Sequence, residues 1–270
     1  MSDKFLQGRT ALVTGSVQGI GLAIAERLAQ AGAAIVLHGL ADAAQAAEAT
    51  ASLRLAGAPD VLFLDHDLRD AAAIDALMQR ALGWRGGLDI VVNNAGIQHT
   101  APLVAMPPDR WEAILAVNLS AAFHTMRHAL PGMLERGYGR VVNVASVHGM
   151  VASVHKAPYV ASKFGLVGLT RVAALECAAA GTRDSGGVTA NCIAPAWTET
   201  AIIQPQIDAR AAQFGGDRDA GMRDLLREKQ PSLRTSKPSE IGEVAAMLCQ
   251  PWAHNINGAT IPVDGGWTAQ

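Results

Sequence analysis

The chain has 270 residues, of which 50% are hydrophobic and 17% are charged, so it can bury a substantial core. Its formal net charge is −2, with Lys+Arg 22 against Asp+Glu 24 and no basic run, which argues against binding to nucleic acid or to an anionic membrane. No apolar stretch is long enough to span a bilayer, and the first residues lack the pattern of a signal peptide. We therefore expect a cytoplasmic protein.

Short apolar runs alternate with longer amphipathic segments along the chain. The expected strands are residues 11–13, 34–37, 61–64, 90–92, 141–144, 188–193 and 260–263. The expected helices are residues 20–31, 42–55, 70–82, 111–134, 159–179 and 239–248. This alternation, with strands apolar on both faces, predicts an α/β protein. We expect one domain, residues 1–270, with a doubly wound Rossmann fold whose seven-stranded parallel sheet carries helices on both faces.

Two segments depart from this rhythm. Residues 198–237 are polar and carry Gly215-Gly216, and compact domains rarely hold so long a connection without a function. We interpret them as a helical lid over a site, with a tolerated surface insertion as the alternative. Residues 181–187 precede the sixth strand at its N-terminal end, away from the edge where ligands bind, and we expect a neutral surface loop.

The cysteines form an odd and widely spaced set, Cys177, Cys192 and Cys249, with no CxxC pair. Free cysteines are often buried as small hydrophobic residues, and no local signature indicates a nucleophile. We expect three reduced thiols and no metal site.

A glycine-rich segment, residues 14–21 (TGSVQGIG), lies where the first strand ends and the first helix begins. Glycines there let backbone N–H groups approach a phosphate, and the N-terminus of the helix adds partial positive charge. The spacing is G-x3-G-x-G, not the commoner G-x-G-x-x-G, and glycine at such turns can also be purely steric. At the first strand-to-helix turn of this pattern, the segment predicts a dinucleotide site.

The residues after the second strand bear on the choice of cofactor. An NADP site needs a cation for the 2′-phosphate, and no Arg or Lys occurs between Arg27 and Arg54. The acid that would hold a ribose 2′-hydroxyl is also missing from the strand tip, since Asp42 comes a few residues late. The missing cation favours NAD.

Tyr159 and Lys163 are four residues apart at the start of an expected helix. Residues i and i+4 share one helical face, so Lys163 can stand beside Tyr159. A phenol has a pKa of about 10, and a nearby cation favours the phenolate and lowers that pKa. The pair could then exchange a proton with an alcohol or a ketone while a hydride is transferred. A chance YxxxK on a helix is the alternative.

Taken together, residues 14–21, residues 93–96 (NNAG), Ser146 after the fifth strand and Tyr159-x-x-x-Lys163 resemble the short-chain dehydrogenase/reductase family. The resemblance covers essentially the whole chain in order and spacing. It implies that Tyr159 is the acid/base and that Ser146 hydrogen-bonds the substrate oxygen. It also implies that Lys163 lowers the pKa of Tyr159 and binds the nicotinamide ribose, and that Asn118 holds a water in a proton relay. Read alone, Asn118 could equally be a residue that bonds the backbone or kinks a helix.

The same resemblance implies the cofactor contacts. Asn94 and Gly96 would line the crevice beyond the fourth strand, and Asp67-Leu68 matches the adenine contact. The full cofactor-binding set is Gly15, Val17, Gln18, Gly19, Ile20, Gly21, Asp67, Leu68, Asn94, Gly96, Tyr159, Lys163, Pro195 and Thr198.

One departure from the family follows Pro195, where Ala196 stands in place of the usual glycine. Alanine fits there only if its φ is negative or mild strain is accepted. Thr198 and Thr200 are both candidates for a hydroxyl facing the nicotinamide carboxamide.

Polar residues near the expected site indicate an acidic substrate. Lys156 lies at a helix entrance, where a cation is electrostatically unexpected unless it meets a carboxylate. A solvated surface lysine is the alternative, and His148 could simply cap or pack.

Residues 94–100, 228–233 and 263–268 are further similar to the subgroup of bacterial D-3-hydroxybutyrate dehydrogenases. In that subgroup a small 3-hydroxy acid is held by side chains that match Gln98, Ser146, His148, Lys156, Tyr159 and Gln206, between apolar walls that match Trp197 and Trp267. The resemblance implies NAD-dependent oxidation of (R)-3-hydroxybutyrate to acetoacetate, with the 3-keto acid as the substrate of the reverse reaction. It also implies a homotetramer.

Two other functions stay open at this point. One is reduction of another ketone such as a 3-oxoacyl thioester, which usually requires NADP and a basic docking surface. The other is a cofactor-binding regulator without catalysis, against which the intact set Asn118, Ser146, Tyr159 and Lys163 argues.

Overall fold

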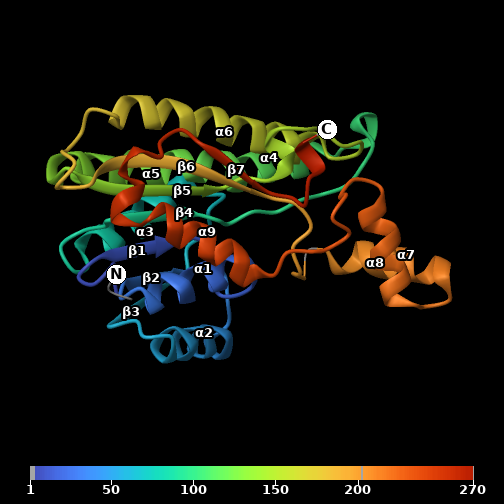
Figure 1. Cartoon of the computed structure of the whole chain (residues 1–270), viewed down its shortest axis with the longest axis horizontal. Coiled ribbons are helices and arrows are strands. Elements are labelled where there is room, and N and C mark those ends of the chain that lie inside the picture. The colour runs from blue at the N-terminus through green and yellow to red at the C-terminus, as the bar shows by residue number, and fades with distance from the viewer. Residues whose placement is uncertain (1–3, 202, 270) are drawn as a thin grey trace.

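A single parallel sheet of seven strands forms the centre of the molecule (Figure 1), in a computed structural model that describes residues 4–201 and 203–269. The strand order is β3-β2-β1-β4-β5-β6-β7, and every neighbouring pair is parallel. The strands are β1 Thr10–Val13, β2 Ala34–His38, β3 Val61–Leu64, β4 Ile90–Asn93, β5 Tyr138–Val144, β6 Gly187–Pro195 and β7 Thr260–Val263. The predicted sheet is thus confirmed.

Helices cover both faces of the sheet, as the apolar character of the strands predicts. One face packs against α1 Gly19–Gln30, α2 Ala43–Leu55 and α9 Pro238–Leu248. The other packs against α3 Ala71–Gly83, α5 Ala121–Arg136 and α6 Ala157–Cys177. Side chains alternate along each strand, so Val13 belongs to the first core and Leu12 to the second. The three cysteines are buried and free, as expected.

Two aspartates set the starts of the helices that follow β2 and β3. Asp42 accepts a hydrogen bond of 2.8 Å from the backbone N of Gln45, and Asp70 accepts one of 2.9 Å from Ala72. Each is the capping residue just before its helix, because its side chain satisfies a backbone N–H that has no partner within the helix. Helix α1 has no such side-chain cap.

Residues 111–134 are helical throughout, as predicted, but the helix is not a regular α-helix. The structure has α4 Pro108–Leu115, a π-helical turn Ala116–Ser120 and then α5. The side chain of Asn118 in this turn bonds the backbone of Ile97 at both its N and its O, at 2.9 and 3.0 Å. The wider turn therefore coincides with a tertiary contact that periodicity does not reveal.

Residues 198–237 contain two helices, α7 Gln204–Ala211 and α8 Arg218–Arg227, which stand out on one side of the molecule (Figure 1). Their inner faces meet in a small apolar cluster that includes Ile207 and Leu225 and reaches Trp197. Residues 181–187 lie at the N-terminal end of β6, where the Arg140 guanidinium donates to the carbonyl oxygens of Gly186 and Gly187. This agrees with the expected surface loop. Within the described residues, no helix is both long and apolar enough to cross a membrane.

Candidate active site

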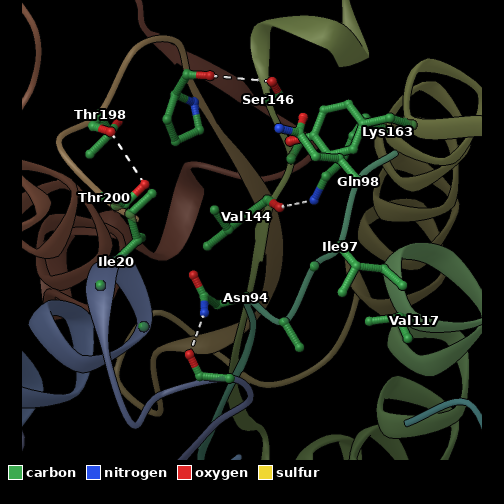
Figure 2. Close-up of a pocket in the computed structure, with 18 of the residues that line it drawn as sticks. Ile20, Asn94, Ile97, Gln98, Val117, Val144, Ser146, Lys163, Thr198 and Thr200 are labelled. Carbon is green, nitrogen blue, oxygen red and sulfur yellow. Dashed lines mark hydrogen bonds between the residues drawn. The ribbon is translucent and has the colours of Figure 1, made fainter. Parts of the chain in front are cut away.

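A cavity of about 630 Å³ opens at the carboxyl ends of the strands. All the residues predicted for cofactor and substrate line it. Figure 2 shows Ser146 and Gln98 on one side and Ile20 of the glycine segment on the other. Asn118 is the one predicted site residue, among those the structure describes, that does not line it. Open parallel sheets bind ligands at this edge, so the location is the expected one.

The glycine segment forms one wall through conformations that only glycine adopts easily. Gly15 and Gly19 have φ of +61° and +59°. A Cβ on Gly21 would lie 2.2 Å from the Gly15 carbonyl oxygen and 2.4 Å from Asn94 Nδ2, so this position admits no side chain. The segment leads into the uncapped N-terminus of α1. Close backbone and uncapped N–H groups form a cradle that fits a pyrophosphate.

Asn94 braces this cradle from the loop after β4. Its Nδ2 donates to the carbonyl oxygens of Thr14 and Gly15, each at 2.9 Å, while its backbone N donates to Thr14 Oγ1 at 3.0 Å. Asn94 therefore holds the glycine segment in place from the neighbouring strand end.

Ser146, Tyr159 and His148 lie together at the other end of the cavity. Ser146 Oγ accepts a hydrogen bond of 3.2 Å from the His148 backbone N and lies 3.4 Å from His148 Nδ1. The imidazole stands edge-on to the Tyr159 ring, with centroids 5.8 Å apart. Burial raises the pKa of Tyr159, and a hydrogen bond with Ser146 acts in the opposite direction.

Lys163 follows Tyr159 by one helical turn and is 3% exposed. Its Nζ donates a 2.8 Å hydrogen bond to the Val144 carbonyl oxygen (Figure 2) and lies 5.7 Å from the centroid of the Tyr159 ring. Burial lowers the pKa of Lys163 to about 8. The structure does not show the expected lowering of the Tyr159 pKa by this cation, because burial raises that pKa and the opposing contribution comes from the Ser146 hydrogen bond.

The side chain of Asn118 does not line the cavity and bonds the backbone of a neighbouring loop. Both ends of its amide bond the Ile97 backbone, and Nδ2 also lies 3.3 Å from Ser162 Oγ. It therefore fixes the loop that follows β4, beside Gly96. Its role toward a water stays a prediction.

Two lysines lie near the indole rings of Trp197 and Trp267, and one of them, Lys156, lines the cavity. Lys156 Nζ lies 5.6 Å from the Trp197 ring centroid, and Lys229 Nζ lies 5.3 Å from that of Trp267. The two indoles stack with centroids 6.1 Å apart. In the part of the chain that the structure describes, no Asp or Glu lies within ion-pair distance of either lysine. Burial and the charge of Lys229 lower the pKa of Lys156.

His148 is neutral in this setting. Burial lowers its pKa to about 3, and the charges of Lys156 and Lys229 act in the same direction. Its Nε2 is buried without a hydrogen-bond partner among the described residues, as are Trp197 Nε1 and Thr198 Oγ1. Buried polar atoms are normally paired, so these three fit a polar ligand in the cavity.

Trp267 is fixed by its neighbours in the C-terminal turn. Asp264 accepts hydrogen bonds from the backbone N of Gly266 at 3.0 Å and of Thr268 at 2.8 Å. It also accepts one of 2.6 Å from the Thr268 hydroxyl, so the turn that carries Trp267 is tied on both sides.

The backbone conformation of residue 196 explains why alanine can stand here in place of the glycine that is usual in the family. Ala196 is not among the residues with positive φ, so the conformation is open to alanine without strain. Its N donates to the Val263 carbonyl oxygen at 3.1 Å. Thr198 is 3% exposed and Thr200 also lines the cavity, so both hydroxyl candidates remain.

Sequence reasoning missed several residues at the site. His38, His66 and Arg69 line the cofactor end of the cavity, and Arg69 pairs with Asp67. Lys229 lies within the similar segment 228–233, but nothing in its spacing shows that it meets the loop before α6. A position at the end of a strand or in the loop that follows it was the sequence signal that could have identified His38, His66 and Arg69.

Three comparisons relate the chain to known proteins. The family model for short chain dehydrogenases matches residues 9–211. The D-beta-hydroxybutyrate dehydrogenase of Cupriavidus necator is 47% identical over 98% of this chain and 100% of its own length, and that of Rhizobium meliloti (strain 1021) is 38% identical over 97% and 99%. The crystal structure of a gluconate 5-dehydrogenase from Burkholderia cenocepacia J2315, in complex with NADP and tartrate, superposes with a TM-score of 0.86. That protein is 34% identical, with coverage of 99% of this chain and 98% of the other.

The chain belongs to the short chain dehydrogenase family. It is an oxidoreductase, and its Rossmann-type fold binds a nicotinamide cofactor. Both relatives are named D-beta-hydroxybutyrate dehydrogenase, and this chain aligns with 100% and 99% of their respective lengths.

Proposed function

We propose that the protein catalyses the NAD-dependent oxidation of (R)-3-hydroxybutyrate to acetoacetate and the reverse reduction. The observation that carries this proposal is Lys156, a buried ammonium group that lines the same cavity as Tyr159 and has no carboxylate partner among the described residues. Lys229, beside Trp267, adds a second positive charge near it. The similarity to two D-beta-hydroxybutyrate dehydrogenases supports it.

The acid end of the substrate is recognised by charge and by amides. Lys156 binds the carboxylate, and Gln98, Gln206 and His148 supply further polar groups, all of them lining the same cavity. A buried cation is costly unless paired, so a carboxylate relieves a penalty that a neutral alcohol leaves in place. The stacked Trp197 and Trp267 form an apolar wall that favours a short chain.

The proton is handled by Tyr159 and Ser146. Ser146 Oγ and the phenol hold the C3 oxygen between them, and the phenolate takes the hydroxyl proton during oxidation. A nicotinamide held in the cavity would supply the acceptor for the hydride that leaves C3. The raised pKa of Tyr159 keeps the phenol protonated at neutral pH, which suits proton donation to the ketone.

Lys163 and Asn118 support this transfer. Lys163 Nζ faces the side of the cavity near Gly96, where it would bind the nicotinamide ribose and place positive charge near the phenolate. Asn118, through the loop that it fixes, would hold the water of a proton relay.

The residues that would hold the cofactor line the rest of the cavity. Residues 17–21 and Gly15 would hold the pyrophosphate, Asp67 and Leu68 would contact the adenine, Asn94 and Gly96 would line the middle, and Pro195 and Thr198 would contact the carboxamide. NAD is favoured because the tip of β2 offers Gly39 and Leu40 and no cation. Arg69 also lines the cavity, but it forms an ion pair with Asp67.

The proposed function also includes a lid over the substrate, a homotetrameric assembly and a cytoplasmic location. Residues 198–237 close over the substrate, since Ile203 and Gln206 line the cavity. Residues 1–270 act as one NAD-binding domain of a cytoplasmic homotetramer. Exposed apolar side chains on α5 and α6, Phe123, Phe164, Val172 and Leu175, support assembly.

A substrate panel with NAD and NADP tests the function. It contains both enantiomers of 3-hydroxybutyrate, a longer 3-hydroxy acid, a 3-oxoacyl thioester and a neutral secondary alcohol. We expect the highest kcat/KM for (R)-3-hydroxybutyrate with NAD. Turnover confined to the thioester or to the neutral alcohol with NADP would overturn both the substrate and the cofactor. Light scattering on the purified protein tests the tetramer.

A further inference from the structure

His38 is the last residue of β2 and links two segments that line the cofactor end of the cavity. Its side chain is 2% exposed. Nδ1 accepts a hydrogen bond of 3.2 Å from the backbone N of Gly15, and Nε2 lies 2.9 Å from the carbonyl oxygen of His66. The imidazole thus bridges the glycine segment and the loop after β3.

These partners select one form of the ring. The Gly15 N–H can only donate, so Nδ1 must be unprotonated, and the His66 carbonyl can only accept, so Nε2 must carry the proton. Only the neutral Nε2–H tautomer satisfies both. Protonated His38 would present an N–H to the Gly15 N–H and lose that bond.

The backbone of His38 adds to the connection. Ser16 N donates to the His38 carbonyl oxygen at 2.7 Å, and His38 N donates to Ser16 Oγ at 3.0 Å. Gly15, with φ of +61°, also lies close against the loop after β4, since a Cβ there would come within 2.9 Å of Ala95 Cα. Side chain and backbone of one residue therefore fix the first turn of the glycine segment.

We propose that neutral His38 is a positioning residue for the nicotinamide cofactor, which holds the Gly15 N–H and so sets the glycine segment in its phosphate-binding conformation. The charged and titratable groups that face it are Asp65 and His66 on the loop after β3. Burial lowers its pKa, with Asp65 acting in the opposite direction, so the neutral form prevails near neutral pH. The inference does not depend on the substrate.

Two substitutions separate the two bonds of the ring. Asn places its amide oxygen near the position of Nδ1, so His38→Asn keeps an acceptor for Gly15 and loses the donor to His66. Gln reaches the position of Nε2, so His38→Gln keeps the donor to His66 and loses the acceptor. Each variant gives up one buried hydrogen bond and both should lose similar thermal stability, which leaves cofactor affinity as the discriminating readout.

The experiment is a fluorescence titration of the full-length protein with NADH and with NADPH, which carry the same pyrophosphate. We expect His38→Asn to keep the Kd within about threefold, and His38→Gln and His38→Ala to weaken it about tenfold, the cost of an unpaired buried N–H. The loss should appear in Kd and in KM for the cofactor more than in kcat at saturating cofactor. Equal Kd values for the Asn and Gln variants would overturn the proposal.

A pH series supplies a second readout. Because protonation removes the acceptor for Gly15, the wild-type Kd should rise as the pH falls through the His38 pKa, which burial lowers from its ordinary value. The Kd of His38→Asn should stay flat. His128→Asn, at a partly exposed histidine that pairs with Asp75, serves as the control and should follow the wild type. A wild-type Kd that falls in acid, through simple attraction of the pyrophosphate to a charged ring, would contradict the inference.

Discussion

The ammonium group of Lys163 donates a 2.8 Å hydrogen bond to the carbonyl oxygen of Val144, the last residue of β5. This bond ties the helix that carries Tyr159 to the strand that leads into Ser146. The proton-transferring groups of the proposed reaction are therefore held together by a buried lysine, which itself loses hydration.

Lys163 should make the stability of the protein depend on alkaline pH. Its pKa of about 8 in the folded chain lies below the ordinary 10.5, so between these values the unfolded chain binds more protons. The contribution of Lys163 is present above the unfolded pKa and is lost as the pH falls through 8. Relative to Lys163→Met, the wild type should gain about 2 kcal/mol in its free energy of unfolding from pH 7 to pH 10. Urea unfolding at both pH values measures this, and parallel pH profiles for the two proteins would contradict it.

Tyr159→Phe should lower kcat for oxidation by about 10³-fold, because no other group takes the hydroxyl proton. Since burial raises the pKa of Tyr159 and oxidation needs the phenolate, wild-type oxidation should accelerate as the pH rises through the alkaline range. The variant should lose this slope. Steady-state kinetics across pH provides the measurement. Tyr138→Phe, at the other tyrosine and outside the cavity, is the matched control and should keep the wild-type profile.

Lys156→Ala should raise KM for 3-hydroxybutyrate about 10- to 100-fold, the worth of a hydrogen bond to a charged group. Turnover of a neutral secondary alcohol should change by less than about threefold, because that substrate has no carboxylate to lose. Lys237→Ala, at an exposed lysine that precedes α9, should leave both unchanged. Equal losses on acid and neutral substrate would mean that Lys156 does not bind the carboxylate.

Lys229 connects the end of α8 to the loop before α6, since its Nζ donates to Ser153 Oγ at 2.7 Å. Lys229→Met should raise KM for the acid and also raise the pKa of Lys156, whose charge it opposes. Binding of the acid should then persist to higher pH than in the wild type. Ser153→Ala removes the hydrogen bond but keeps both charges, so it should raise KM without that shift. The pH dependence of KM in the two variants shows whether Lys229 acts through its hydrogen bond to Ser153 or through its charge.

Leu40→Arg should admit NADP. Leu40 lines the cavity beyond β2 and is 66% exposed, so a guanidinium there can reach a 2′-phosphate. We expect kcat/KM with NADP to rise at least about tenfold, as for a charge-assisted hydrogen bond. Leu55→Arg, at the exposed end of α2 and outside the cavity, should have no effect on either cofactor. No gain with NADP in Leu40→Arg would place the adenosine ribose elsewhere.

Local patterns were sufficient for most of the fold. All seven strands could be predicted because each is a short run that is apolar on both faces, and Asp42 and Asp70 marked helix starts within one residue. The glycine segment and Tyr159-x-x-x-Lys163 indicated the cavity for the same reason, since their spacing has a direct geometric meaning. The π-helical turn inside the helix over residues 111–134 could not be predicted, because it coincides with the bond of Asn118 to Ile97, a residue 21 positions away.

The sequence by itself determined the class of sheet, and it predicted where the cofactor binds and which residues form the acid/base pair, because these predictions follow from periodicity and from fixed offsets along one helix. Only the tertiary structure decided the burial of these groups, the direction of their pKa shifts and their long-range contacts. Burial, and not the neighbouring lysine, sets the direction of the Tyr159 pKa, and Lys229 meets Ser153 across 76 residues of chain. His38 reaches both walls of the cofactor end for the same reason: hydration and long-range contacts arise only when distant segments pack together.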